Sequence, residues 1–175
     1  MVKLSPSAET PLFLIGFMAS GKTTVGRIVA TRLGWRFHDL DQIICDAAGR
    51  SVARIFADEG EAGFRLREIE ALRAATRLQS AVIATGGGAA CNDSNLSLML
   101  ASGRVVALSV TPEEVLRRVG ADSGRPLLSP STSAAALLAT REVFYARAHH
   151  RVDTAGKSPE EVAGEVLGLI DAGQP

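Results

Sequence analysis

One eight-residue stretch constrains the fold of this chain more than any other. Residues 16–23, GFMASGKT, fit the pattern G-x-x-x-x-G-K-[ST] at every fixed position. This spacing builds a loop whose backbone N–H groups point inward and bind phosphate oxygens. Lys22 is expected to reach the β- and γ-phosphates of a nucleotide, and the Thr23 hydroxyl to ligate Mg²⁺. The residues predicted to bind the nucleotide here are Ala19, Ser20, Gly21, Lys22, Thr23 and Thr24.

The segments on either side of this loop favour the same interpretation. Residues 12–15, LFLI, form a short apolar run typical of a buried strand. After the loop, Val25, Val29 and Leu33 recur at helical spacing, and Gly34 follows where glycine often ends a helix. An ordinary glycine-rich turn would also fit the loop alone. Strand, loop and helix in this order indicate an anion site at a helix N-terminus instead.

The whole chain reads as an alternating α/β protein. Its 175 residues suit a single domain, 1–175. The β-type runs fall at 12–16, 35–39, 81–85, 104–110 and 151–154, and the helical stretches between them include 61–78 and 133–150. Helix starts are signalled by TPEE at 111–114 and SPEE at 158–161. This alternation predicts a five-stranded parallel sheet covered by helices on both faces, in three layers.

Composition narrows the expected partners and location. The formal net charge is zero, which argues against bulk electrostatic attraction to nucleic acid or to an anionic membrane. No secretory or spanning segment is evident, and Cys45 and Cys91 lack metal-ligand spacing. We therefore expect a cytoplasmic protein with two free thiols, and a neutral surface makes a monomer the default expectation.

Two segments are expected to be less regular than the rest. Residues 1–11 are polar and contain proline, so we expect them to fray. Residues 120–132 contain two glycines, two prolines and three serines. This composition predicts a long mobile loop. A plain surface connection would have the same composition. Because Arg125 lies inside this loop, we interpret it as a lid that closes over the phosphates.

The second β-type run ends in two candidate catalytic carboxylates. Asp39 and Asp41 are two residues apart, so on an extended chain both side chains would point into the crevice where parallel strands end. One is expected to organise Mg²⁺ and its waters, and the other to accept a proton from a substrate hydroxyl. The alternative is a solvated acidic turn that caps the following helix.

The third β-type run ends in three consecutive glycines, Gly86, Gly87 and Gly88. Glycine at a strand end permits close approach of the backbone to a ligand, so their N–H groups are expected to bind a small polar substrate. Arg65 lies near the start of a predicted helix, where an arginine can bind a carboxylate through two hydrogen bonds. Residue chemistry alone does not distinguish Arg65 or Arg141 from solvated surface arginines.

Taken together, these motifs resemble the shikimate kinase family. The similarity runs from Leu12 to about Ile170 and includes GFMASGKTTVG, DLD at 39–41, IFADEGEAGFR at 55–65, ATGGGA around the three glycines, RPLL at 125–128, and Arg141 with Tyr145. The resemblance implies a fold like that of nucleoside monophosphate kinases, with a five-stranded parallel sheet and a lid. It also implies transfer of the γ-phosphoryl group of ATP to the 3-hydroxyl of shikimate, in aromatic biosynthesis.

The resemblance assigns roles on the acceptor side of the site. It implies that Asp41 binds the shikimate hydroxyls and is the candidate base, and that Arg65 and Arg141 hold the carboxylate. Gly87 would meet the substrate through its backbone. Thr23 would ligate Mg²⁺, with Asp39 behind a water.

On the nucleotide side, the resemblance implies that Arg118 lies on the adenine and that Arg125 moves in with the lid toward the phosphates beside Lys22. Lys157 and Pro159 fall in the stretch that corresponds to the adenine-side loop.

Two departures and two alternatives accompany this interpretation. Ala19 replaces a glycine common in the family's loop, where a Cβ is expected to be tolerated, and Val143 stands where proline is frequent. A related kinase of another small acid, such as gluconate, would share the phosphate loop and the size. A non-catalytic nucleotide-binding protein is the second alternative, although such proteins usually lose residues that remain here, among them Lys22, Thr23 and Asp41.

Overall fold

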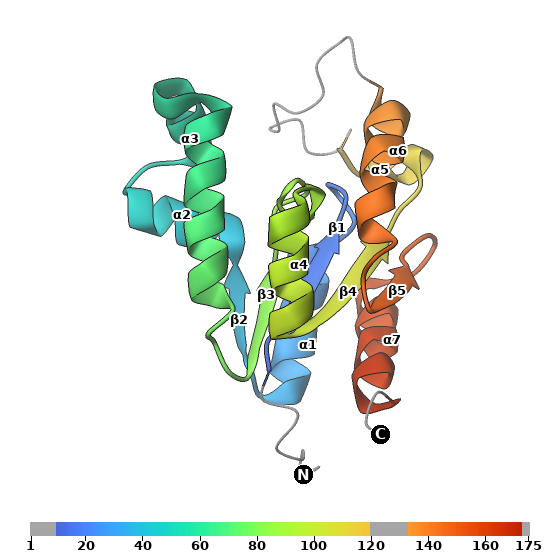
Figure 1. The fold of residues 1–175 in the computed structure, drawn as a ribbon. Coiled ribbons are helices and arrows are strands. Elements are labelled where there is room, and N and C mark those ends of the chain that lie inside the picture. Colours follow the sequence, from blue (N-terminus) through green and yellow to red (C-terminus); the bar gives the residue numbers. More distant parts are fainter. Residues whose placement is uncertain (1–9, 120–132, 173–175) are drawn as a thin grey trace.

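The polypeptide folds into three layers, with one β-sheet between two layers of helices (Figure 1). The computed structural model describes residues 10–119 and 133–172. Residues 1–9 and the expected lid 120–132, including Arg125, lie outside the described residues. The elements are β1 (Leu12–Gly16), α1 (Lys22–Leu33), β2 (Arg36–Asp39), α2 (Leu40–Ala48), α3 (Val52–Ala75), β3 (Ala81–Ala84), η2 (Ala89–Cys91), α4 (Asp93–Ser102), β4 (Arg104–Ser109), α5 (Pro112–Val119), α6 (Ala134–Tyr145), β5 (His150–Asp153) and α7 (Pro159–Ala172).

The five strands form one parallel sheet in the order β2-β3-β1-β4-β5, which confirms the predicted fold class. β1 lies in the middle, and all five of its residues are buried. Because helices cover both faces of a central parallel strand, it needs an uninterrupted apolar run, which LFLI supplies. The chain leaves β1 toward one face of the sheet and leaves the adjacent β3 toward the other, so a crevice opens between their carboxyl ends.

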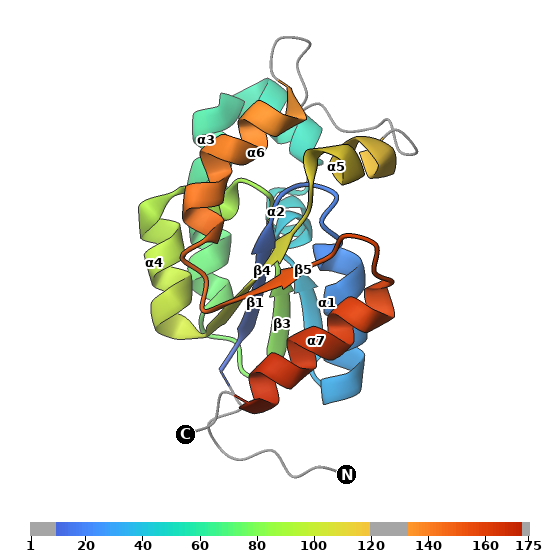
Figure 2. The same cartoon turned by 90° about the vertical axis from the view of Figure 1, so that its right-hand side faces the viewer.

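Alternate residues of β1 belong to two separate cores. Phe13 and Ile15 pack with the buried residues of α2, α3 and α4, whereas Leu12 and Leu14 pack with those of α1 and α7. Figure 2 shows α1 and α7 on one face of the sheet and α3, α4 and α6 on the other. The two-residue period of a strand therefore connects both helical layers to the strand that carries the phosphate loop.

The predicted end of α1 and the predicted start of α7 agree with the structure. Gly34 adopts φ 68° at the end of α1, in the left-handed region that favours glycine. At the start of α7, the Ser158 N–H donates to Glu161 Oε2 at 2.7 Å and the Glu161 N–H donates to Ser158 Oγ at 3.2 Å. This reciprocal pair is the capping box that the SPEE sequence predicts.

Two predicted helix boundaries are wrong. The helix predicted at 61–78 runs from Val52 to Ala75, with a kink at Gly60, where φ is 69°. The helix predicted at 133–150 ends at Tyr145, and His150 begins β5. The residues after Tyr145 instead bond to the sheet, since the Val105 N–H donates to His149 Nδ1 at 3.0 Å. Helical periodicity could not reveal this tertiary bond.

The N-terminal end of the described chain is better held than the expected fraying of residues 1–11 suggests. Pro11 is buried, and its carbonyl accepts the Arg104 N–H at 3.0 Å, which extends the β1–β4 pairing by one residue. Within the described ranges, every helix is too short or too polar to cross a membrane.

Two glycine substitutions should have opposite effects on stability. Gly168→Ala, in the exposed interior of α7, meets no atom within 4 Å and should raise the free energy of unfolding by about 0.5–1 kcal/mol, through higher helix propensity. Gly34→Ala also meets no atom within 4 Å, but it places a Cβ at φ 68° and should lower that free energy by about 1 kcal/mol. Urea denaturation of both variants would measure the difference, and equal effects would contradict the backbone argument.

Candidate active site

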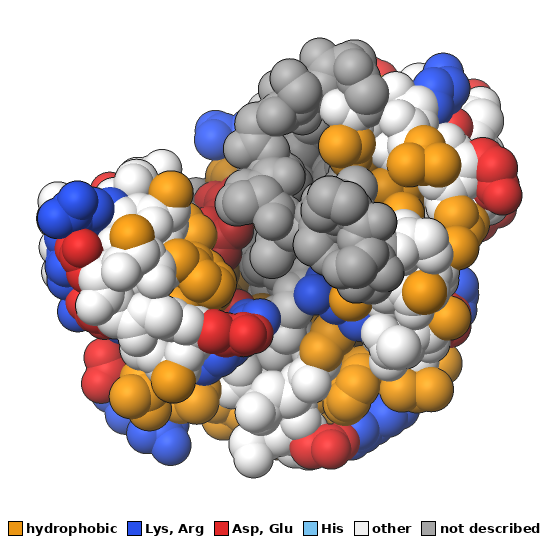
Figure 3. All heavy atoms as spheres, turned by 90° about the horizontal axis from the view of Figure 1, so that it is seen from above, with side chains coloured by type: hydrophobic (Ala, Val, Ile, Leu, Met, Phe, Trp, Pro, Cys, Tyr) orange, Lys and Arg blue, Asp and Glu red, His pale blue; other side chains and the backbone are white. Residues whose placement is uncertain are grey.

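The residues of interest lie at the carboxyl ends of the strands. Figure 3 views this end of the molecule, with α2 and α3 on one side and α5 and α6 on the other. The loop between β1 and α1 crosses the middle of it, as the G-x-x-x-x-G-K-[ST] pattern predicts.

Lys22 lies inside the curve of this loop. Its Nζ donates hydrogen bonds to the carbonyl oxygens of Gly16, at 2.9 Å, and Phe17, at 2.8 Å, and lies 3.4 Å from Ser20 Oγ. The residue is only 9% exposed, so its charge is directed into the loop rather than into bulk solvent. The loop therefore presents a buried cation at the N-terminus of α1, where the helix dipole also favours an anion.

The backbone of the loop requires residues without a Cβ at two positions. A Cβ on Gly16, at φ +141°, would lie 2.4 Å from the Leu108 carbonyl oxygen of β4. Gly21 adopts φ +90° at the start of α1. Ala19 also has a positive φ, 58°, so the expected tolerance of this alanine comes with backbone strain of about 1 kcal/mol.

Asp39 connects the end of β2 to the phosphate loop. Its Oδ2 accepts the Thr23 hydroxyl at 2.9 Å, and its Oδ1 accepts the backbone N–H of Asp41 at 3.1 Å. The expectation that both aspartates lie on an extended chain is wrong, because α2 begins at Leu40 and Asp39 is its N-cap. Asp39 therefore caps a helix, as the alternative interpretation expected, and it also accepts a hydrogen bond from Thr23, the predicted metal ligand.

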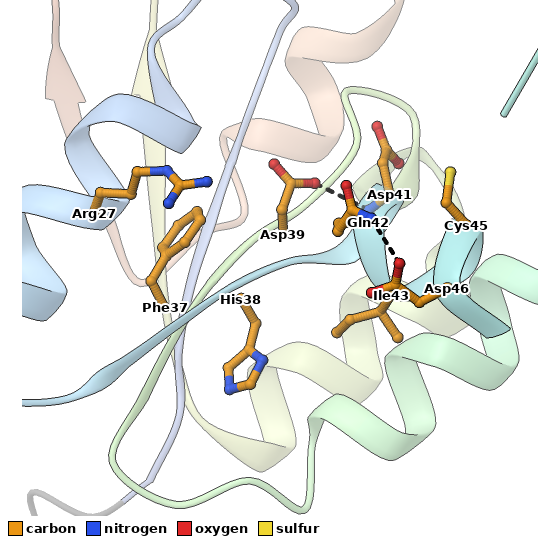
Figure 4. A pocket seen from close by; sticks show the side chains of 9 residues that line it. All are labelled: Arg27, Phe37, His38, Asp39, Asp41, Gln42, Ile43, Cys45 and Asp46. Carbon is orange, nitrogen blue, oxygen red and sulfur yellow. Dashed lines mark hydrogen bonds between the residues drawn. The ribbon is translucent and has the colours of Figure 1, made fainter. Parts of the chain in front are cut away.

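The outer side of the two aspartates borders a hollow of about 460 Å³ (Figure 4). The residues that line it are Arg27, Phe37, His38, Asp39, Asp41, Gln42, Ile43, Cys45 and Asp46. The Arg27 guanidinium lies 4.8 Å from the centre of the Phe37 ring at one side of the hollow. Asp39 therefore has the phosphate loop on one side and open space on the other.

Each of the three glycines faces one of the predicted substrate-binding side chains. A Cβ on Gly86 would lie 2.9 Å from an Asp41 carboxylate oxygen. A Cβ on Gly87 would lie 3.5 Å from the Arg141 guanidinium and 3.4 Å from the Met18 nitrogen. A Cβ on Gly88 would lie 2.8 Å from the Arg65 guanidinium.

The turn after β3 thus brings together a carboxylate from α2 and arginines from α3 and α6. It also touches the phosphate loop, so the predicted acceptor residues and the predicted phosphate residues form one continuous site. Absence of a side chain at Gly86 and at Gly88 permits the two closest of these approaches, whereas the distances at Gly87 are ordinary van der Waals contacts.

Glu68 is a site residue that the sequence reasoning missed. Arg65 Nη1 donates to both of its carboxylate oxygens, at 3.1 and 2.9 Å, and Glu68 is 2% exposed. Burial raises the pKa of Glu68, Arg65 and Arg141 act in the opposite direction, and Asp41 adds to the rise. The signal available in the sequence was the three-residue spacing from Arg65, which places both side chains on one helix face.

The two arginines of the acceptor side are further held by aromatic rings. The Arg65 guanidinium lies 5.6 Å from the centre of the Phe64 ring, and that of Arg141 lies 5.5 Å from the centre of the Phe17 ring in the phosphate loop. A guanidinium in such a position is attracted by the negative face of the ring. Both cations therefore face the glycine turn from fixed directions.

Arg118 joins α5 to the two loops on the opposite side of the crevice. Its Nη1 donates to the Ala19 carbonyl at 2.9 Å, and its Nη2 donates to the Thr154 carbonyl at 3.2 Å. Lys157 lies three residues beyond Thr154 and pairs with Glu165 of α7 at 2.7 Å, and Pro159 begins that helix. Of the predicted adenine-side residues, Arg118 therefore contacts the phosphate loop, and Lys157 and Pro159 follow the Thr154 segment to which Arg118 also bonds.

The fold and this arrangement define a phosphate-loop kinase. A family model described as shikimate kinase matches residues 18–171. The chain therefore belongs to the shikimate kinase family, as the motif resemblance predicted.

Individual relatives agree with the family match. A shikimate kinase of Geobacter metallireducens is 45% identical over 170 residues, which cover 95% of each chain. The structure of "Shikimate kinase from Acinetobacter baumannii in complex with shikimate" matches with a TM-score of 0.88 at 35% identity, covering 96% of each chain. A gluconokinase from Sinorhizobium meliloti matches with a TM-score of 0.64 at 17% identity, covering 94% of this chain and 93% of that one, which shows a shared fold alone.

Acidification should weaken the ion pairs that hold Arg118. Hydrogen bonds from Arg117 and Arg118 lower the pKa of Glu114 to about 2, from an ordinary value of 4.5. A carboxyl with a lowered pKa in the folded state stabilises that state above its unfolded pKa, and the stabilisation is lost as the pH falls through the folded value. Glu114→Gln should therefore lower the urea midpoint at pH 7, and the difference from wild type should shrink between about pH 4.5 and pH 2.

Glu113→Gln is the matched control for this titration. Glu113 lies in the same first turn of α5, and among the described residues it forms no ion pair within 4.0 Å. A Glu114 difference that stayed constant down to pH 2, or a Glu113 variant with the same pH dependence, would contradict the assignment.

Proposed function

We propose that this protein transfers the γ-phosphoryl group of ATP to the 3-hydroxyl of shikimate, giving 3-phosphoshikimate and ADP on the route to chorismate and the aromatic amino acids. One observation carries the proposal within this family. The turn at Gly86–Gly88, which touches the phosphate loop, lies against one carboxylate and two arginines. That set matches an acceptor that bears both a hydroxyl and a carboxylate.

On the acceptor side, Asp41 accepts the proton of the reacting hydroxyl. A base must lie within hydrogen-bond reach of that proton, and Asp41 lies beside the turn that adjoins the phosphate loop. Arg65 and Arg141 bind the substrate carboxylate, and the amides of Gly86, Gly87 and Gly88 bind its polar groups. Phosphoryl transfer needs little more than this positioning together with charge neutralisation.

On the donor side, the amides of residues 19–24 and the Lys22 ammonium bind the phosphates. Arg118, Lys157 and Pro159 contact the adenine from the edge of the loop. Arg125, outside the described residues, joins Lys22 in neutralising the transferred phosphoryl group.

The side chains at Thr23 and Asp39 fit a magnesium ion. A hydroxyl and a carboxylate oxygen, 2.9 Å apart at the N-terminus of α1, supply the hard oxygen ligands that Mg²⁺ prefers. Within residues 10–119 and 133–172 no cluster of three His, Cys, Asp or Glu side chains could hold a metal, which suits an ion bound mainly by phosphates and waters. When bound, the ion neutralises phosphate charge, while Thr23 and Asp39 fix its place beside Lys22.

We further propose that the protein acts as a monomer in the cytoplasm, since a zero net charge does not favour attachment to an anionic membrane surface. The alternative acceptor, gluconate, has support only from a fold likeness at 17% identity. A coupled assay of ADP release with Mg²⁺ and a panel of hydroxy acids separates the two. Shikimate should exceed gluconate by orders of magnitude in kcat/KM, because a wrong acid leaves buried polar groups unpaired. Equal turnover of both acids would overturn the proposal.

Asp41→Asn should abolish the base while keeping the shape of the side chain. We expect kcat to fall by about 10²–10⁴, with the KM for ATP largely unchanged. Asp46→Asn is a matched control, because it changes a carboxylate near the other end of α2 whose described partner is Gln42. Steady-state kinetics of both variants would test the role of Asp41, and a near-normal kcat for Asp41→Asn would contradict it.

Gly88→Ala should displace the arginine that binds the carboxylate without unfolding the protein. The new Cβ would lie 2.8 and 3.0 Å from the two terminal nitrogens of Arg65, the flexible end of that side chain, and φ of −96° permits alanine. We expect a rise of about tenfold in the KM for shikimate, an unchanged KM for ATP and little change in melting temperature. Arg65→Ala should show the same pattern more strongly. Parallel rises in both KM values would contradict the carboxylate assignment.

A further inference from the structure

The buried hydroxyl of Tyr145 is bonded to the glycine turn, and the mechanism above does not use it. Tyr145 lies at the C-terminal end of α6 and is 4% exposed. Its Oη donates to the Gly87 carbonyl oxygen at 2.6 Å, and Cys91 Sγ lies 3.7 Å from the same oxygen. Burial raises the pKa of Tyr145, so the phenol keeps the proton that it donates.

The carbonyl groups of the three glycines are all bonded within the protein. The Gly86 carbonyl accepts the Ala89 N–H at 3.1 Å, and the Gly88 carbonyl accepts the Cys91 N–H at 3.0 Å. These two bonds arise inside the turn, whereas the bond to Gly87 comes from another helix. In the part of the chain that the structure describes, the N–H groups of the three glycines donate no hydrogen bond to the protein.

The hydrogen bond to the Gly87 carbonyl also determines where the Gly88 N–H points, because the two groups belong to one planar peptide. The Gly87 C=O and the Gly88 N–H belong to one planar peptide, and no described peptide bond is cis. In a trans peptide these two groups point in opposite directions, so holding the carbonyl on Tyr145 fixes where the Gly88 N–H points. Three consecutive glycines have wide backbone freedom of their own, which makes such an external contact effective.

The same helix face carries a predicted carboxylate ligand. Arg141 and Tyr145 are four residues apart on α6, so their side chains lie on one face. The Arg141 guanidinium lies 3.5 Å from the Cβ position of Gly87, the residue whose carbonyl Tyr145 holds. Tyr145 and Arg141 therefore meet the turn at the same residue, Tyr145 at its carbonyl oxygen and Arg141 beside its Cβ position.

We propose that Tyr145 is a positioning residue for the acceptor: its hydroxyl orients the Gly87–Gly88 peptide and aligns Arg141 with it, so that the turn and the arginine bind the hydroxy acid together. This inference rests on the proposed function, because it concerns the same acceptor site.

Tyr145→Phe removes only the hydroxyl and leaves the ring in the core. The expected result is a rise of about tenfold in the KM for shikimate, with the KM for ATP changed less than twofold. A purely structural role would lower stability without separating the two KM values. Thr140→Val is the matched control, because it also removes one hydroxyl from α6, an exposed one bonded to the Leu137 carbonyl, and should leave both KM values unchanged.

A second measurement leaves the hydrogen bond in place. Tyr145 is the only tyrosine in the sequence, so growth with 3-fluorotyrosine labels this position alone. The ¹⁹F resonance should shift when shikimate is added to saturation and should stay in place with a magnesium–adenine nucleotide alone. This readout needs no folded mutant.

The outcomes separate the inference from the function on which it depends. Suppose that wild-type protein releases ADP with shikimate. If Tyr145→Phe then leaves both KM values unchanged, or if the ¹⁹F resonance does not shift when shikimate is added, the positioning role is overturned while the function stands. If wild-type protein shows no shikimate-dependent ADP release, the function itself fails. A selective rise in the shikimate KM together with a shikimate-dependent ¹⁹F shift supports the inference.

Discussion

Close approach of backbone segments at the ends of β1 and β3 is the constraint on which the site depends. The phosphate loop passes so near β4 that a Cβ on Gly16 would lie 2.4 Å from the Leu108 carbonyl. The turn after β3 in turn lies against that loop, with 3.4 Å between the Cβ position of Gly87 and the Met18 nitrogen. Because adjacent parallel strands end at the same edge of the sheet, two loops remote in sequence share one small volume. Glycine is required at Gly16, where a Cβ would meet backbone, whereas the distances at Gly87 are ordinary van der Waals contacts.

The charged residues around this volume differ in burial. Glu68 is buried, at 2% exposure, and holds Arg65, while Asp41 and Arg141 are partly exposed and face the turn from two other helices. A buried carboxylate is costly to ionise unless a cation accompanies it, and Arg65 is that cation. Asp39 accepts two hydrogen bonds: one of its oxygens caps α2, and the other accepts the Thr23 hydroxyl.

Sequence reasoning succeeded where a residue's role follows from local pattern. The phosphate loop, the parallel sheet, the αL end of α1 at Gly34 and the capping box at Ser158 all follow from short-range spacing, and the structure agrees with each. It failed where a tertiary bond overrides the pattern. The expected helix 133–150 stops at Tyr145, and the segment after it leads into β5, beside the bond that His149 accepts from β4. The aspartates were expected on one extended strand, yet helix α2 begins between them.

The sequence by itself determined which chemical groups are present and which secondary-structure element carries most of them. It could not determine that Gly86, Gly87 and Gly88 would each face a different side chain, from α2, α6 and α3 respectively. Nor did it identify Glu68, or the partner of Tyr145, because helix packing determines these contacts. Local spacing fixes the direction of a side chain relative to its own backbone, whereas contacts between elements depend on how the whole sheet and its two helical layers close around their cores.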